Sequence, residues 1–65
     1  MIKVKTKKGH AFIDVLNILS AEQDEKENVR IYCTNRNYTD TTEEFDVVIN
    51  KIEKMLIRIS GGVNV

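Results

Sequence analysis

An apolar stripe near the carboxyl end sets the strongest limit on how this 65-residue chain can fold. Apolar side chains recur there at intervals of three and four residues, at Phe45, Val48, Ile49, Ile52 and Met55 or Leu56. This spacing is typical of one amphipathic helix, which must bury its stripe against another layer of structure. The residues before the helix have to provide that layer.

The ends of this helix follow from local signals. Either Thr41 or Thr42 can cap the helix, and Thr41 with Glu44 has the spacing of a capping box. After Leu56 the pattern fits either a longer helix or a last strand, and we favour a helix to about Arg58. The final stretch, residues 61–65, begins with two glycines and is expected to form a flexible tail.

Alternating residues predict short strands before the helix. Residues 2–7 alternate apolar with basic, and residues 29–34 place Val29, Ile31 and Cys33 on one face and Arg30, Tyr32 and Thr34 on the other. Gly9 can take a positive φ in a turn after the first strand, which makes a hairpin. An asparagine-containing turn then leads from the 29–34 strand to a further strand at 38–41.

The segment 11–23 is too rich in apolar residues to fix its register. Either Ala11, Ile13 and Val15 face inward, or Phe12 does. A turn or bulge near Asp14 would divide the segment into two short strands. We therefore predict an α+β fold, an antiparallel meander of four to five short strands packed on one C-terminal amphipathic helix, in a single domain at residues 1–60.

A chain of this length has a small core, and such domains usually need a disulfide, a metal or a partner chain. The sequence has one cysteine, Cys33, and one histidine, His10. Two soft ligands do not make a structural zinc site, and one cysteine cannot form an internal disulfide. Self-association is therefore the expected source of added stability, and no cofactor or metal is expected.

One helix can cover only one side of the sheet, so the other side must meet water or a partner. The candidate partner or nucleic-acid face carries basic and aromatic residues, namely Lys3, Lys5, Lys7, Arg30, Tyr32 and Tyr38. Tyrosine and arginine favour protein interfaces, and basic residues with tyrosines can also hold single-stranded nucleic acid. Zero net charge and the acidic run at 22–27 weigh against nucleic acid, which stays as the alternative.

No residue pattern points to catalysis or to a small-molecule substrate. Cys33 shares a strand face with Val29 and Ile31, which indicates a core residue, and no spacing pairs two carboxylates for acid-base chemistry. The expectation is a non-enzymatic protein with a protein or self partner. Because no signal peptide or membrane-spanning run is recognisable, the cytoplasm is the expected location.

The order of elements resembles the small FlbD/SwrD family of flagellum-associated proteins over most of the chain. The resemblance rests on "MIKV", Gly9, "AFID", "ILSAEQDEKENVRIYCTN", Tyr38 and the helix "EEFDVVINKIEKM". It implies a compact accessory or regulatory protein of a bacterium, and a phage protein of this architecture would look the same. The stretch "FIDVLNILSAEQDEKENVRIYCTN" with "LIRIS" is also similar to the first part of LytTR DNA-binding domains.

Overall fold

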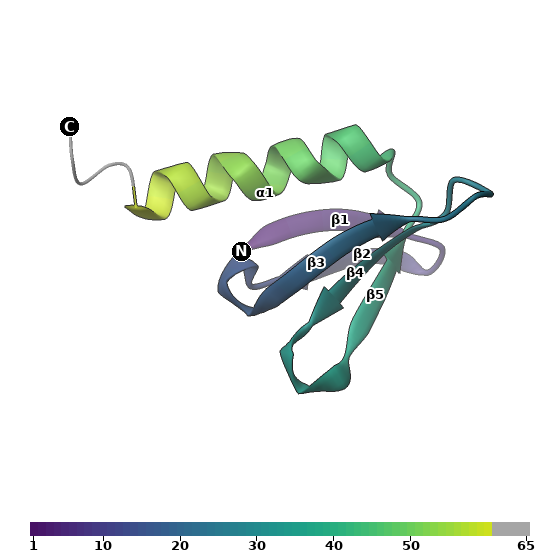
Figure 1. Cartoon of the computed structure of the whole chain (residues 1–65), viewed down its shortest axis with the longest axis horizontal. Coiled ribbons are helices and arrows are strands. Elements are labelled where there is room, and N and C mark those ends of the chain that lie inside the picture. The colour runs from purple at the N-terminus through teal and green to yellow at the C-terminus, as the bar shows by residue number, and fades with distance from the viewer. Residues whose placement is uncertain (61–65) are drawn as a thin grey trace.

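The computed structural model describes residues 1–60 and shows short strands packed beneath one long helix (Figure 1). The strands are β1 (Ile2–Thr6), β2 (Gly9–Ile13), β3 (Ile18–Gln23), β4 (Val29–Cys33) and β5 (Tyr38–Thr41). Helix α1 spans Phe45–Ser60, and two short 3₁₀ turns, η1 (Val15–Asn17) and η2 (Thr34–Arg36), complete the elements. The predicted α+β fold is therefore confirmed. The predicted tail at 61–65 lies outside the described residues.

The five strands form two antiparallel sheets. One contains β1 and β2, and the other has the order β3-β4-β5. The division falls at η1, where the Asp14 carboxylate accepts a hydrogen bond from the Leu16 amide at 3.0 Å and turns the chain. Because of this turn, β2 and β3 do not pair as neighbours in a single meander.

Strand parity places the core between the two sheets and the helix. Its members are aliphatic: Ile2, Val4, Ile13, Val29, Ile31 and Val48. Ile13 and Val15 are buried, whereas Phe12 is exposed, which decides the register that the sequence leaves open. Cys33 is half-buried and packs against this core, as its place beside Val29 and Ile31 predicts.

Gly9 and Asn35 in the predicted turns have backbone conformations that their residue types tolerate, whereas Arg36 does not. Gly9 has a φ of 134°, a value that L side chains rarely adopt. Asn35 and Arg36, between β4 and β5, both have φ near 65°, at 68° and 64°. Asparagine tolerates this left-handed region better than arginine does, because its short side chain bonds locally to the backbone.

The start of α1 differs from the sequence-based expectation. The Val48 amide donates to the Glu44 carbonyl at 3.1 Å, and Thr41 remains in β5. The Thr41 hydroxyl donates to the Lys5 carbonyl at 2.7 Å and accepts from the Glu43 amide at 3.1 Å. The predicted capping box of Thr41 with Glu44 is therefore wrong, because the hydroxyl joins β5 to β1.

After Leu56 the sequence allowed either a longer helix or a last strand. The structure has a helix there, and α1 continues to Ser60. Its stripe runs through Phe45, Ile52 and Met55, which pack against the core. Leu56, the other residue considered for the last position of the stripe, is 43% exposed.

Candidate interaction surface

The structure divides the predicted face between the two sheets. Lys3 and Lys5 are exposed on β1, and Lys7 lies in the turn to β2. Arg30 and Tyr32 are half-buried on β4, opposite an exposed Tyr38 on β5. The aromatic and guanidinium groups therefore come together, and the lysines of β1 belong to a different sheet.

Pairing of β4 with β5 assembles the cluster. Arg30 is the register partner of Asp40, and Tyr32 is the register partner of Tyr38. Since residues two apart in a strand share a face, all four side chains lie on one side of the sheet. We call Arg30, Tyr32, Tyr38 and Asp40 the Arg30 cluster.

In the Arg30 cluster, the guanidinium group contacts both the Asp40 carboxylate and the Tyr38 ring. Arg30 Nε and Nη2 donate to the two Asp40 carboxylate oxygens at 2.7 and 3.2 Å. The guanidinium carbon also lies 3.9 Å from the centre of the Tyr38 ring, which is cation–π geometry. The rings of Tyr32 and Tyr38 are 6.3 Å apart and tilted by 56°. These contacts bring three long side chains together on one side of the sheet.

Protonation behaviour of the pair follows from these contacts. The hydrogen bonds from Arg30 hold the pKa of the Asp40 carboxyl below its usual value, and the charge of Lys7 acts in the same direction. Asp40 in turn raises the pKa of Arg30, mainly by accepting its hydrogen bonds. The pair therefore stays ionised at neutral pH.

Charges around the Arg30 cluster do not add up to a positive surface. An open depression runs from the cluster to the β1–β2 turn, and Lys7 and Lys8 line it. Three of its lining residues are basic, including Arg30, and five are acidic: Glu22, Asp24, Glu27, Asp40 and Glu43. Because acidic groups outnumber basic ones, this surface suits a polyanion less well than a protein.

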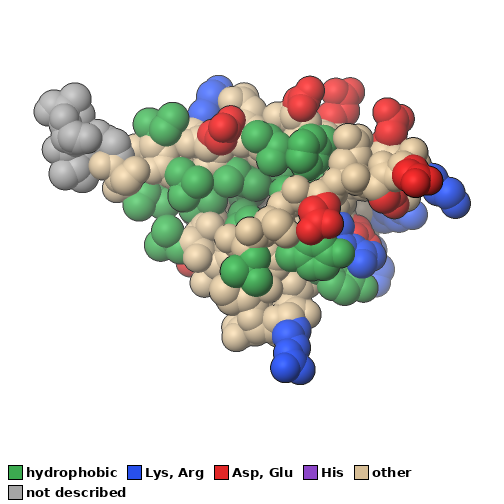
Figure 2. Space-filling view, viewed as in Figure 1, with side chains coloured by type: hydrophobic (Ala, Val, Ile, Leu, Met, Phe, Trp, Pro, Cys, Tyr) green, Lys and Arg blue, Asp and Glu red, His purple; other side chains and the backbone are tan. Residues whose placement is uncertain are grey.

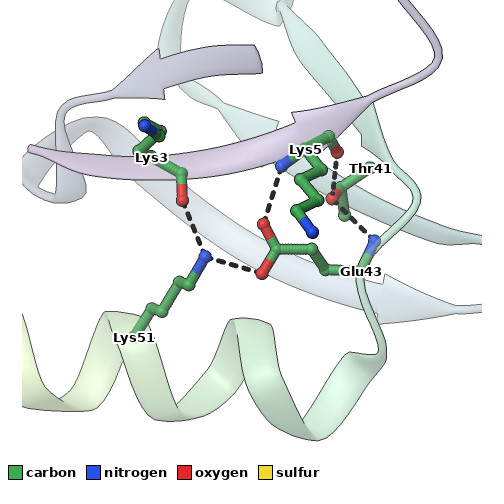
Figure 3. A network of polar contacts seen from close by, with 5 residues as sticks. All are labelled: Lys3, Lys5, Thr41, Glu43 and Lys51. Atoms are coloured by element: carbon green, nitrogen blue, oxygen red, sulfur yellow. Dashed lines mark hydrogen bonds and ion pairs between the residues drawn. The ribbon is translucent and has the colours of Figure 1, made fainter. Parts of the chain in front are cut away.

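A second polar group, the Glu43 network, joins the free edge of β1 to the segment before α1 and to the helix (Figure 3). The Glu43 carboxylate accepts from the Lys5 amide at 2.7 Å and from Lys51 Nζ at 2.6 Å. Lys51 Nζ also donates to the Lys3 carbonyl at 2.8 Å. The network comprises the side chains of Thr41, Glu43 and Lys51 and the backbone of Lys3 and Lys5.

Lys3 and Lys5 were predicted to belong to the partner face. In the Glu43 network their main-chain groups have a structural role. The backbone groups of Lys3 and Lys5 form hydrogen bonds with side chains of β5, of α1 and of the segment between them. Sequence reasoning missed the network because Lys5 and Glu43 are 38 residues apart, and Lys3 and Lys51 are 48 apart. The acidic run at 43–46 gave only a local signal for a helix start.

Groups suited to metal binding do not gather within residues 1–60. No set of three or more His, Cys, Asp or Glu side chains in this range is placed to hold a metal ion. The same part of the chain contains no helix that is both long and apolar enough to cross a membrane.

Comparisons with known proteins identify no relative. No protein family, curated protein or solved structure matches this chain.

Proposed function

We propose that this chain is a small, non-enzymatic interaction module that binds a protein partner in the cytoplasm through the Arg30 cluster. The observation that carries this proposal is the arrangement of one half-buried arginine, Arg30, with the half-buried Tyr32 and the exposed Tyr38 on β4 and β5. Tyrosine and arginine provide much of the binding energy in protein interfaces, because they combine a large apolar area with hydrogen-bonding groups.

Pre-arrangement supports the proposal on energetic grounds. Ordering a flexible side chain at an interface costs about 0.5–1.5 kcal/mol. Arg30 contacts Asp40 and the Tyr38 ring, so its side chain is already partly ordered in the free protein and loses less conformational entropy on binding. The module therefore presents a defined surface without a closed pocket. The resemblance to FlbD/SwrD proteins agrees with an accessory or regulatory role.

The proposal includes self-association, since the small core favours a partner chain. Nucleic-acid binding is the alternative. It would use the exposed lysines of β1 together with the Arg30 cluster, and binding would weaken steeply with salt. The pairing of Arg30 with Asp40 removes one of the cations that such binding needs.

Tyr38→Ala tests the proposed function, with Phe12→Ala as the matched control. Both residues are exposed aromatics, 54% and 67% exposed, but Phe12 lies on the other sheet. Tagged proteins are used to capture partners from cells that express the native gene, and the affinity of the captured protein is then measured by calorimetry. Loss of a central tyrosine should weaken binding by at least about tenfold, whereas the control should bind normally.

Two outcomes contradict the proposed function. Equal binding by the Tyr38→Ala and Phe12→Ala proteins would remove the Arg30 cluster from the interface. Tight binding of a single-stranded oligonucleotide, with an affinity that falls linearly with salt on logarithmic axes, would favour the alternative function.

A further inference from the structure

Helix α1 is longer than the sheet that supports it. The Glu43 network sets the two elements in register, because Glu43 contacts Lys5 and Lys51 contacts Lys3. The helix therefore runs antiparallel to β1. From Lys3 back to Met1 the strand rises by about 6.6 Å, which matches roughly four helical residues. By this estimate the helix passes the end of β1 near Met55, and Figure 1 shows the carboxyl end of α1 projecting beyond the start of β1.

Burial along the helix agrees with this register. Val48 is completely buried and Met55 still packs against the core. Beyond it, Leu56, Ile57 and Ile59 are 43%, 66% and 45% exposed. Leu56 and Ile59 continue the apolar stripe at helical spacing, so the stripe extends past its own sheet. We call residues 56–60 the overhang.

A second exposed apolar group lies at the same end of the molecule. Met1 precedes Ile2, which pairs with Ile13 just before η1, and η1 contacts α1. Leu16 lies in η1 and Leu19 at the start of β3, and each is at least 66% exposed. We call Met1, Leu16 and Leu19 the shelf. Figure 2 shows hydrophobic side chains on the underside of the carboxyl half of the helix and on the sheet below it.

The overhang projects past the end of the sheet that carries the shelf (Figure 1), and we call the corner between the two the notch. We propose that this notch is the interface of a two-fold homodimer, in which the overhang of each copy fills the notch of the other. A projecting arm beside a recess is self-complementary under a two-fold rotation, the operation that relates the halves of most homodimers. The two overhangs then pack antiparallel, and the end of each reaches the shelf of the other copy.

The balance of apolar residues identifies the occupant as a second copy. Seven hydrophobic residues of the described chain are buried, all of them aliphatic, and five large apolar residues in the same part of the chain are exposed at the notch, namely Met1, Leu16, Leu19, Leu56 and Ile59. A domain with a small core and an exposed apolar cluster of this size gains most from a partner that is always present, because small cores leave little stability in reserve.

Charge complementarity points the same way. Arg58 lies on the overhang, and Asp14 lies beside the shelf, where it caps η1 next to Leu16. The exchange of overhangs brings Arg58 of one copy toward Asp14 of the other, and opposite charges at the rim of an apolar contact favour this orientation. This inference rests on the self-association within the proposed function, but it does not involve the Arg30 cluster.

The experiment measures solution mass by analytical ultracentrifugation over a concentration series, with circular dichroism to verify the fold of each variant. Leu56→Glu and Ile59→Glu place a charge in the notch. Val47→Glu is the matched control, because Val47 is on the same helix and is 42% exposed, but lies outside the notch. The native chain and the control should be dimers, and both notch variants should dissociate at least about tenfold more readily.

Three results would overturn the inference. A native chain that stays monomeric at millimolar concentration has no such interface. Notch variants that dimerise as well as Val47→Glu would show that the notch is not buried. Dissociation by Tyr38→Ala but not by the notch variants would place the self-interface on the sheet face. Loss of partner capture in Tyr38→Ala with an intact dimer would support both proposals separately.

Discussion

At the scale of single residues, the Glu43 carboxylate joins two distant parts of the chain, β1 and α1. Its side chain is 10% exposed and accepts from the backbone of β1 and from the ammonium group of Lys51. Partial burial opposes ionisation of this carboxyl, but the hydrogen bonds from Lys51 and from the Lys5 amide outweigh it and keep the pKa of Glu43 below its usual value. The charged form is therefore part of the folded structure.

Glu43→Gln is expected to lower the free energy of unfolding at pH 7 by about 1–3 kcal/mol, since hydrogen bonds to a charged group are lost. Because the folded pKa of Glu43 is lowered, its contribution is complete above the unfolded pKa and disappears as pH falls through the folded pKa. The difference between the native and Gln proteins should thus be constant near neutrality and shrink below about pH 4.5.

Urea unfolding at a series of pH values measures this difference. Glu44→Gln provides the control, because Glu44 is exposed and precedes α1. The control should differ little from the native protein across the series. A Glu43→Gln protein with native stability at pH 7, or a difference that does not shrink as the pH is lowered from neutrality into the acid range, would contradict a role for the ionised carboxylate.

At the scale of elements, the sequence predicts local structure better than it predicts the contacts between elements. Alternation identified β1 and β4, and the stripe from Phe45 identified α1, because these patterns report which side of an element is buried. The division into two sheets depends on the turn at η1, where Asp14 gave only a general turn signal. The role of Thr41 depends on a partner in β1 that no local pattern shows.

The backbone conformation of the turn between β4 and β5 lowers the stability of the folded protein, and a substitution can remove this strain. Asn35 and Arg36 are consecutive residues with positive φ, and the left-handed region costs a non-glycine residue about 1–2 kcal/mol. Glycine avoids this cost but loses about 0.5–1 kcal/mol in conformational entropy on folding. Arg36→Gly should therefore stabilise the protein by about 0.5–1 kcal/mol.

The midpoint of urea unfolding checks this prediction, with Arg36→Ala as the control. Alanine removes the long side chain but retains the Cβ atom, so it should give little gain. Equal stabilisation by alanine and glycine would mean that the arginine side chain, and not the backbone conformation, causes the effect.

At the scale of the whole molecule, the two-sheet arrangement separates groups that the sequence placed on one face. Lys3 and Lys5 lie on β1, whereas Arg30, Tyr32 and Tyr38 lie on the β4–β5 pair. Alternation correctly gave the outer side of β1 and β4, but the relation between the sheets is set by contacts distant in sequence. The notch also escaped prediction, because exposure of Leu56 and Ile59 depends on where the sheet ends and not on their spacing.

A dimer built on the notch would make thermal stability depend on protein concentration, because dissociation accompanies unfolding. Over a hundredfold rise in concentration, the midpoint of thermal unfolding of the native chain should increase by roughly 5–10 °C for a domain of this size. The Leu56→Glu protein, which unfolds as a monomer, should show no increase. Circular dichroism melts of both proteins measure the two slopes. A native midpoint independent of concentration would mean that the folded state is a monomer, whose exposed aliphatic residues at the notch contribute nothing to its stability.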